Sequence, residues 1–323
     1  MGRRDKITVQ VRKVSLVILK FLVSAVLLYL VISKTGMETV ASTLRNIRVP
    51  YFLFATLIYI LSIYMSTIRW RLLLPGGFNF RRLLSLYLIG SFFNNLLPGI
   101  IGGDAVKAYY LSKELNSAEG HSASELPHPS LTIAIASVFM DRYIGFTALM
   151  FIGLMAFPFG FRYFKGSYIE WILPLLVIIF IIGSFFIFGL RIGRRFSLLS
   201  GFYDYFGLYR RQRTVILKTF IISISVQITG IFAVYAVSRG LNVNTPLLPL
   251  FMFIPIISAI STIPISISGI GVREASFVLL FGFLGIGPAQ ATAISLSWFL
   301  SVALGSLLGL GEYLRYKNKK MSP

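Results

Sequence analysis

Residues 94–107 read NNLLPGIIGGDAVK, a polar and glycine-rich interruption in a chain that is otherwise mostly apolar. Proline removes a helical hydrogen bond and glycine weakens a helix, so a straight helix through this stretch is disfavoured. A carboxylate such as that of Asp104 is costly in hydrocarbon, by roughly 3 kcal/mol on the mildest scale. The stretch therefore indicates a bend in the chain, and it suggests that its charged residues have a function.

The composition is that of a membrane protein. The 323 residues are 56% hydrophobic and only 13% charged, about half the charged fraction of a soluble domain. Long apolar runs recur throughout, which predicts an all-α polytopic membrane protein with a single membrane domain over residues 1–323. The net charge of +20 fits Lys and Arg beside anionic lipid, so we expect no nucleic-acid partner. The chain has no cysteine, which excludes disulfides and thiol chemistry.

Six stretches are long enough to cross a bilayer, at about 20 residues each. The basic start leads into the first of them without a small-residue cleavage site, so we expect a retained helix and not a cleaved signal peptide. The predicted spans are residues 14–33, 51–68, 130–157, 168–190, 215–238 and 288–314.

Lys and Arg gather in four segments, which are the N-terminus, residues 69–82, residues 191–214 and the tail after residue 314. The positive-inside rule places all four in the cytoplasm. The sequence therefore predicts a protein of the plasma (inner) membrane with both termini cytoplasmic.

Two apolar regions, residues 83–111 and 247–286, do not fit this pattern of single crossings. The loop charges require residues 83–111 to begin and end on the cytoplasmic side. These 29 residues supply about 43 Å of helix, whereas two crossings need about 60 Å. We therefore expect a re-entrant helical hairpin that turns near mid-membrane at Pro98–Asp104. By the same logic of loop charges, residues 247–286 begin and end on the outer side. These 40 residues could make two short spans, but the interruption SISGIG favours a second re-entrant hairpin that enters from the opposite face.

The order helix, helix, hairpin, helix then occurs twice, over about residues 14–157 and 168–314, with opposite directions in the membrane. The hairpin tips match weakly, as GIIGGD at 99–104 and GIGVRE at 269–274. An inverted repeat with broken helices near the midplane is typical of transporters. The alternative is eight to ten ordinary helices without a repeat.

Charged residues at depth usually mark a path for a substrate or an ion, although an ion pair can also simply lock two helices together. Guanidinium and ammonium groups suit phosphate oxygens, whereas carboxylates suit an amine or a proton. Three acid–base pairs fall at such depth: Asp104 with Lys107, Asp141 with Arg142, and Arg273 with Glu274.

Small and amide residues near the predicted tips complete the candidate substrate-binding site. Gly102, Gly103 and Gly271 either let the backbone approach a ligand or let helices pack closely. Asn94 and Asn95 either line the same cavity or cap the hairpin, and Pro98 belongs to the bend.

Three blocks, NNLLPGIIGGDAVK, MDRYIG at 140–145 and PISISGIGVREASF at 264–277, together resemble the flippase-like family (UPF0104) that includes the transmembrane domain of lysylphosphatidylglycerol synthases. The marks of that family are P-x-x-x-G-G-D, an acid–Arg pair in a following helix, and G-x-G-x-R-E. This chain departs from the family at Lys107, where Arg is expected, and at Asp141, where Glu is common. The resemblance implies lipid translocation without the synthase activity, because a soluble transferase domain is lacking.

We therefore expect a flippase-like lipid translocator, with no enzymatic activity and no cofactor, whose partners are membrane lipids with anionic or zwitterionic headgroups. An ion-coupled transporter of a small solute is the alternative. An intramembrane aspartyl protease is disfavoured because Ile101 stands where its G-x-G-D motif needs glycine, and no Walker A motif for ATP occurs. The lipid, the direction of transport, the coupling ion and a homo-oligomeric state stay open.

Overall fold

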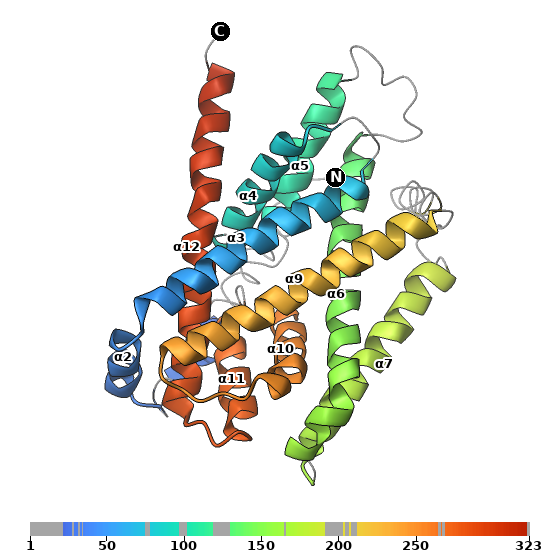
Figure 1. Cartoon of the computed structure of the whole chain (residues 1–323). Helices are drawn as coiled ribbons and strands as arrows, with labels where there is room; N and C mark the ends of the chain where they lie inside the picture. Colours follow the sequence, from blue (N-terminus) through green and yellow to red (C-terminus); the bar gives the residue numbers. More distant parts are fainter. Residues whose placement is uncertain are drawn as a thin grey trace, which may run out of the picture.

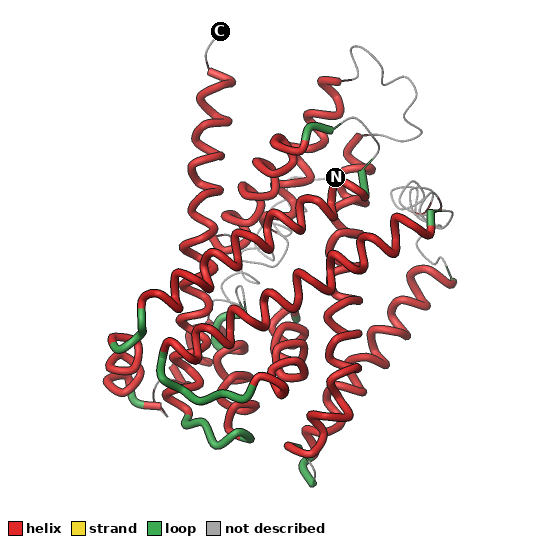
Figure 2. Tube along the Cα trace, in the orientation of Figure 1, coloured by secondary structure: helices red, strands yellow, loops and turns green. Residues whose placement is uncertain are grey.

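The computed structural model of the chain consists of helices joined by loops, and its described residues contain no strand (Figure 2). The structure describes residues 22–74, 78–96, 102–118, 130–190, 203, 207, 212–263 and 266–321, except the single positions 28, 32, 34, 165, 267 and 268.

Two groups of four helices make up most of this part. The first group is α3 (Val49–Leu72), α4 (Phe80–Leu96), α5 (Gly102–Ala118) and α6 (Ser130–Gly160). The second group is α9 (Arg213–Gly240), α10 (Leu247–Thr262), α11 (Val272–Gly282) and α12 (Pro288–Met321). Before the first group comes α2 (Met37–Arg45), and between the groups comes α7 (Ile172–Ser184), which a 3-10 turn at Tyr168–Trp171 precedes and a π turn at Phe185–Gly189 follows.

Five helical segments are long and apolar enough to cross a membrane, and they match five of the six predicted spans. Of the sixth, residues 14–33, the structure describes only a short apolar helix at Leu22–Val31. The second predicted span, about residues 51–68, lies inside α3, which continues to Leu72. The five segments are Val49–Leu72, Ser130–Tyr163, Ile169–Gly189, Arg213–Gly240 and Pro288–Tyr316.

The helices between these spans are shorter. The 17 residues of α4 and of α5 each give about 25 Å of helix, below the roughly 30 Å of a bilayer core. The two helices pack against each other, as do α10 and α11. The predicted bend at Pro98 lies outside the described residues. Each region is thus a pair of short helices, and the re-entrant placement of these pairs stays a prediction.

Helices α3 and α9 lie side by side and run in opposite directions across the molecule (Figure 1). The backbone N–H of Arg48, just before α3, donates to the carbonyl of Gly240 at the end of α9 over 2.9 Å. The short helix α4 packs against α12, and the short helix α10 packs against α6. Each short pair therefore rests on the last long helix of the other group.

Two buried apolar clusters hold these elements together. One includes Trp70, Leu83 and Leu111, where α3, α4 and α5 meet the start of α6. The other includes Phe253 and Phe277, and it lies where α10 and α11 meet the end of α9 and the start of α12. The clusters thus occupy opposite ends of the long helices, one beside each pair of short helices.

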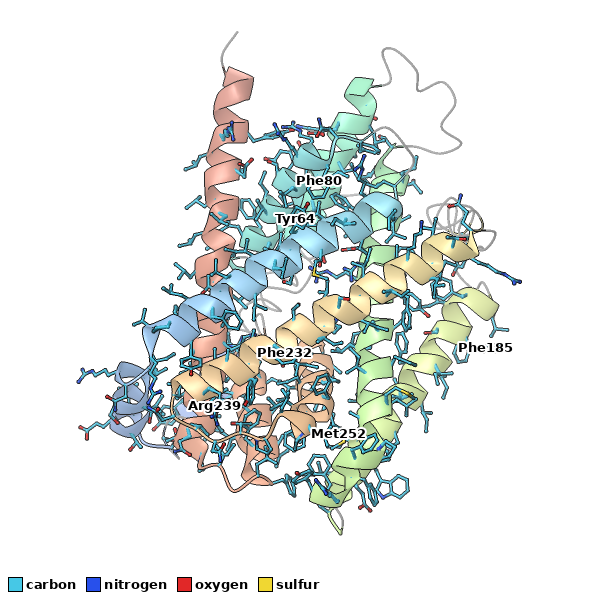
Figure 3. All side chains as sticks on the ribbon, viewed as in Figure 1. Tyr64, Phe80, Phe185, Phe232, Arg239 and Met252 are labelled. Atoms are coloured by element: carbon cyan, nitrogen blue, oxygen red, sulfur yellow. The ribbon has the colours of Figure 1, made fainter. Side chains whose placement is uncertain are left out.

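The outer surface is apolar, as expected for contact with lipid. Phe185, at the end of the α7 segment, is 60% exposed and points away from the helix bundle (Figure 3). Tyr64 of α3 packs edge-on against Phe80 of α4, with ring centroids 5.1 Å apart. Aromatic side chains therefore serve both the exposed surface and the helix contacts.

Candidate functional site

The start of α5 lies unusually close to α4. A Cβ atom added to Gly103 would lie 1.9 Å from the carbonyl oxygen of Gly90 and 2.5 Å from the backbone nitrogen of Asn94. The side-chain oxygen of Asn94 accepts a hydrogen bond from the N–H of Gly103 over 3.0 Å. Asn94 therefore satisfies a free N–H group at this helix start, and glycine at 103 allows the two backbones to meet.

Asp104, in the first turn of α5, forms a bidentate ion pair with Arg142 of α6. The Nε and Nη2 atoms of Arg142 donate to the two carboxylate oxygens over 2.7 and 3.0 Å. The Asp104 side chain is 10% exposed, whereas that of Arg142 is 52% exposed. The guanidinium group is thus held in a fixed direction by Asp104, while the Arg142 side chain as a whole remains partly exposed.

Asp141, the neighbour of Arg142 on α6, is fully buried and binds three side chains. One carboxylate oxygen accepts from Nε of Arg69 over 2.8 Å. The other accepts from the hydroxyl of Tyr87 over 2.9 Å and from Nζ of Lys107 over 3.4 Å. These partners come from α3, α4 and α5, so one carboxylate joins four helices.

Lys107 and Arg69 have further contacts that keep this region closed. The ammonium group of Lys107 lies 4.1 Å from the ring centre of Tyr87 and 4.4 Å from that of Trp70, within the range of cation–π attraction. Nη1 of Arg69 donates to the hydroxyl of Ser223 on α9 over 2.9 Å. The region therefore also ties α9 to the first group of helices.

We call these side chains the first charged cluster. It contains three cations and two carboxylates, so it carries a formal excess of one positive charge. Most of it is sealed, and Arg142 is its exposed cation. Its members are Arg69, Tyr87, Asp104, Lys107, Asp141 and Arg142.

The second charged cluster lies at the start of α11. Glu274, with 0% side-chain exposure, accepts from Arg273 over 2.6 Å and from the hydroxyl of Ser295 on α12 over 3.0 Å. It also accepts from the N–H of Gly271 over 2.6 Å. Gly271 has φ of 84°, a conformation that glycine adopts without strain. Arg273 lies over the ring of Phe299 on α12, 4.6 Å from its centre.

The structure thus gathers the predicted residues into two groups. Asp104, Lys107, Asp141 and Arg142 belong to one, and Gly271, Arg273 and Glu274 to the other. Among the described residues, no hydrogen bond or ion pair joins the two clusters. Gly102 is the first residue of α5, Asn95 donates to the Ser91 carbonyl one turn back over 3.4 Å, and Pro98 lies outside the described residues.

Two members of the first cluster were missing from the sequence prediction. Arg69 was assigned to the cytoplasmic loop 69–82, but the structure places it in the last turn of α3, where it is 4% exposed. Tyr87 is uncharged, so a search for charges at depth passes over it. The signal for Arg69 was its position at the edge of an apolar run, where a small shift of the boundary moves it into the helix. The described residues contain no group of three or more His, Cys, Asp or Glu able to hold a metal ion.

Curated relatives share most of the chain. A UPF0104 membrane protein of Methanothermobacter thermautotrophicus is 24% identical over 345 residues, covering 95% of this chain and 95% of the relative. A UPF0104 membrane protein of Methanocaldococcus jannaschii is 23% identical over 324 residues, covering 89% and 91%. One from Pyrococcus horikoshii is 25% identical over 146 residues, covering 44% and 40%. The similarity to the first two therefore spans both charged clusters.

The model of one protein family, the transmembrane region of lysylphosphatidylglycerol synthases, matches residues 17–309. This range includes all the candidate site residues and all the short helices. The chain therefore belongs to the lysylphosphatidylglycerol synthase transmembrane family, as an integral membrane protein with several membrane-spanning helices.

Proposed function

We propose that the protein moves a polar-headgroup lipid across the bilayer without chemical change to it. The observation that carries this proposal is the Asp104–Arg142 pair, in which the ordered Arg142 side chain remains 52% exposed beside an otherwise mostly sealed cluster with a net positive charge. Guanidinium groups bind phosphate oxygens in a bidentate manner. The lipid phosphate would take the accessible side of Arg142, while the acyl chains stay in the bilayer. Membership of a family named for a lipid synthase supports this reading.

The packing of the helices supports an inverted repeat, which would supply the transport mechanism. If the two groups of helices are exchanged, the contact of α3 with α12 becomes that of α9 with α6. In the same way, the contact between α4 and α12 corresponds to that between α10 and α6, and the contact between α5 and α6 corresponds to that between α11 and α12. Each of these contacts occurs. Rocking of one repeat against the other around a fixed site is the usual way in which such folds alternate access.

In this proposal α4 and α5 form a re-entrant hairpin from the cytoplasmic side of the plasma membrane, and α10 and α11 form one from the other side. Each charged cluster has one carboxylate, Asp104 or Glu274, in the first turn of the second helix of a hairpin. A helix N-terminus carries free N–H groups and a positive dipole end, which favour an anion. The two clusters would then serve opposite leaflets.

The proposal can be tested with the full chain in liposomes that contain a fluorescent phospholipid and a quencher that cannot cross the membrane. We expect wild-type protein to expose inner-leaflet lipid to the quencher. Arg142→Gln, Asp104→Ala and Glu274→Ala should each slow this by about tenfold or more, because a charge-assisted contact contributes about 1.5–3 kcal/mol.

Arg162→Gln is the matched control, since Arg162 is exposed and lies outside both clusters. If Asp104→Ala and Glu274→Ala moved lipid as fast as the wild type, the proposed site would be wrong. Transport of a water-soluble solute with no movement of lipid would instead favour the small-solute alternative.

A further inference from the structure

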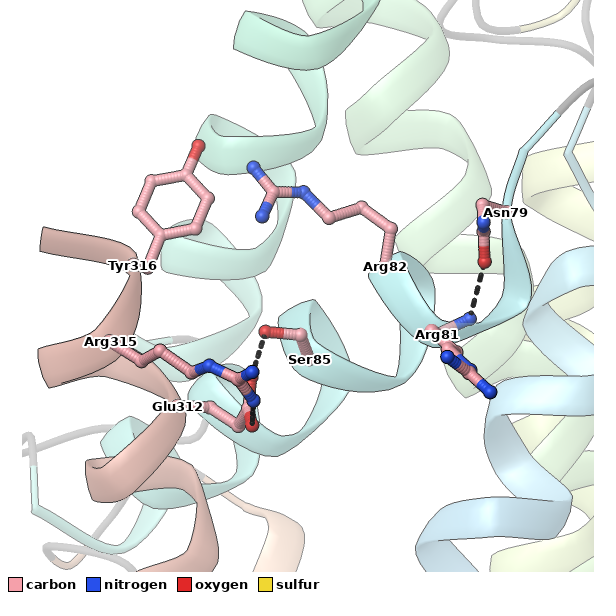
Figure 4. Close-up of a pocket in the computed structure, with 7 residues that line it drawn as sticks. All are labelled: Asn79, Arg81, Arg82, Ser85, Glu312, Arg315 and Tyr316. Carbon is pink, nitrogen blue, oxygen red and sulfur yellow. Dashed lines mark hydrogen bonds and ion pairs between the residues drawn. The ribbon is translucent and has the colours of Figure 1, made fainter. Parts of the chain in front are cut away.

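A cavity of about 390 Å³ opens between α4 and α12, and it lies outside both charged clusters (Figure 4). Its volume falls within the usual range for small-molecule sites, about 300–1,000 Å³. One wall comes from the start of α4 and the residue before it, and the other comes from the last part of α12. The lining residues are Asn79, Arg81, Arg82, Ser85, Glu312, Arg315 and Tyr316.

The lining carries three guanidinium groups against one carboxylate, and a second carboxylate, that of Glu114 on α5, pairs with Arg82, so one positive charge remains in excess. Glu312 accepts from the hydroxyl of Ser85 over 2.7 Å and pairs with Arg315 at 3.6 Å. The Arg315 side chain is 82% exposed, so this pair contributes little to stability. Arg81 forms no ion pair with any described residue. The cavity therefore presents cations that an outside anion could bind.

Arg82 is held in a direction that suits such binding. It forms an ion pair with Glu114 of α5, and its guanidinium lies 4.4 Å from the ring centre of Tyr316. In Figure 4, Arg82 extends across the space between the helices toward Tyr316, while Arg315 reaches in from the α12 side. Two guanidinium groups thus approach the same space from opposite walls.

The cavity also lies where an amphiphile would be found. Tyr316 ends the apolar part of α12, Pro288–Tyr316, and tyrosine is enriched at membrane surfaces. The next residues include Lys317, Lys319 and Lys320, and basic segments beside a span attract anionic lipid. A ligand at this level would have its polar group in the cavity and its chains along α12.

We propose that this cavity is a separate binding site for a phosphate group, borne by an anionic phospholipid at the membrane surface. The forked guanidinium of Arg matches the geometry of phosphate oxygens better than a point charge does. The site goes beyond the proposed translocation path, since binding here needs no movement of the lipid across the bilayer.

The test is a binding titration of the full chain in detergent with three probes: short-chain phosphatidylglycerol, inorganic phosphate, and a glucoside with matching acyl chains. We expect the phosphoglyceride to bind, and Arg315→Gln and Arg82→Gln to weaken it by about tenfold or more. Glu312→Gln should tighten binding, because glutamine still accepts from Ser85 but no longer competes for Arg315. Arg71→Gln is the control, since Arg71 is exposed near the end of α3 and does not line the cavity.

Binding of the phosphoglyceride without binding of inorganic phosphate would identify the ligand as a lipid headgroup. Equal displacement by inorganic phosphate would keep the phosphate site but identify its ligand as a soluble anion. The proposal fails if the glucoside binds as tightly as the phosphoglyceride. It also fails if Arg315→Gln and Glu312→Gln both bind like the wild type. If the wild-type protein bound the phosphoglyceride here but moved no lipid in liposomes, the proposed function would be overturned and this site would stand.

Discussion

At the scale of single residues, Asp141 has the most demanding environment in the first charged cluster. A fully buried carboxylate is tolerated only when its partners compensate for the lost water. Arg69, Tyr87 and Lys107 all donate to it. The two cations also depend on the carboxylate, because removal of Asp141 would leave Arg69 and Lys107 as buried charges without neutralisation.

We therefore expect Asp141→Asn to lower the free energy of unfolding by about 3–5 kcal/mol. Thermal denaturation in detergent would measure this loss. The double variant Asp141→Asn with Lys107→Met should regain part of it, because the methionine removes one buried charge.

Glu38→Gln provides the comparison, since Glu38 is exposed in α2. If Asp141→Asn melted at the same temperature as Glu38→Gln, the compensation described for the cluster would be incorrect.

The sequence was informative about which residues carry charge at depth, and much less so about their partners. Asp141 and Arg142 could be identified because they interrupt an apolar run. The pairing of Asp141 with Arg69, which is 72 positions away, depends on how α3 packs against α6. Arg69 also sits at a helix end, where an error of a few residues decides between loop and core.

At the scale of elements, the contact between α4 and α5 depends on a missing side chain. The N–H of Gly103 reaches Asn94, and its Cα faces the backbone of Gly90. Any side chain at 103 would push the two helices apart. Because Asp104 follows directly, the separation would also move it relative to Arg142 on α6.

Gly103→Ala is therefore expected to destabilise the fold by about 1–3 kcal/mol, the usual cost of overpacking, and to reduce lipid transport. Gly230→Ala is the matched control, because Gly230 lies inside α9 and an added Cβ there meets no atom within 4 Å. Removing that helical glycine should stabilise the protein slightly, by about 0.5–1 kcal/mol. Equal melting temperatures of the two variants would contradict the close contact.

The length of the apolar runs and the charges of the loops predicted where the long helices lie. They did not predict the residues at which the helices begin and end. The long runs near 130–157 and 288–314 are helices in the structure, as α6 and α12. Proline and glycine alone also predicted an interruption in this region, where α4 ends at Leu96 and α5 begins at Gly102. The close approach of the two backbones at Gly103 could not be predicted, because the same glycine pattern fits either a ligand contact or a contact between helices.

At the scale of the whole molecule, the matching contacts in the two groups of helices predict on which face of the membrane the ends of each short pair lie. If α4 with α5 and α10 with α11 are re-entrant hairpins, both ends of each pair lie on one face of the membrane. The two pairs then open to opposite faces. The absence of native cysteine allows this to be tested without prior removal of thiols.

Arg81→Cys and Lys113→Cys should both react with an impermeant maleimide applied from the cytoplasmic side, because they lie at the outer ends of α4 and α5. Leu248→Cys, at the start of α10, should react only from the other side. Opposite accessibility of positions 81 and 113 would show that the first pair crosses the membrane and is not re-entrant.

The crossed packing of the two groups also bears on how the protein is made. Helix α4 is bound to α12 through the Ser85–Glu312 hydrogen bond and through Phe93 against Tyr313, with ring centroids 5.2 Å apart. During synthesis α4 leaves the ribosome long before α12 does. The first short pair can pack early against α3 and α6, but the face of α4 that binds α12 stays without its partner until the last helix has been made.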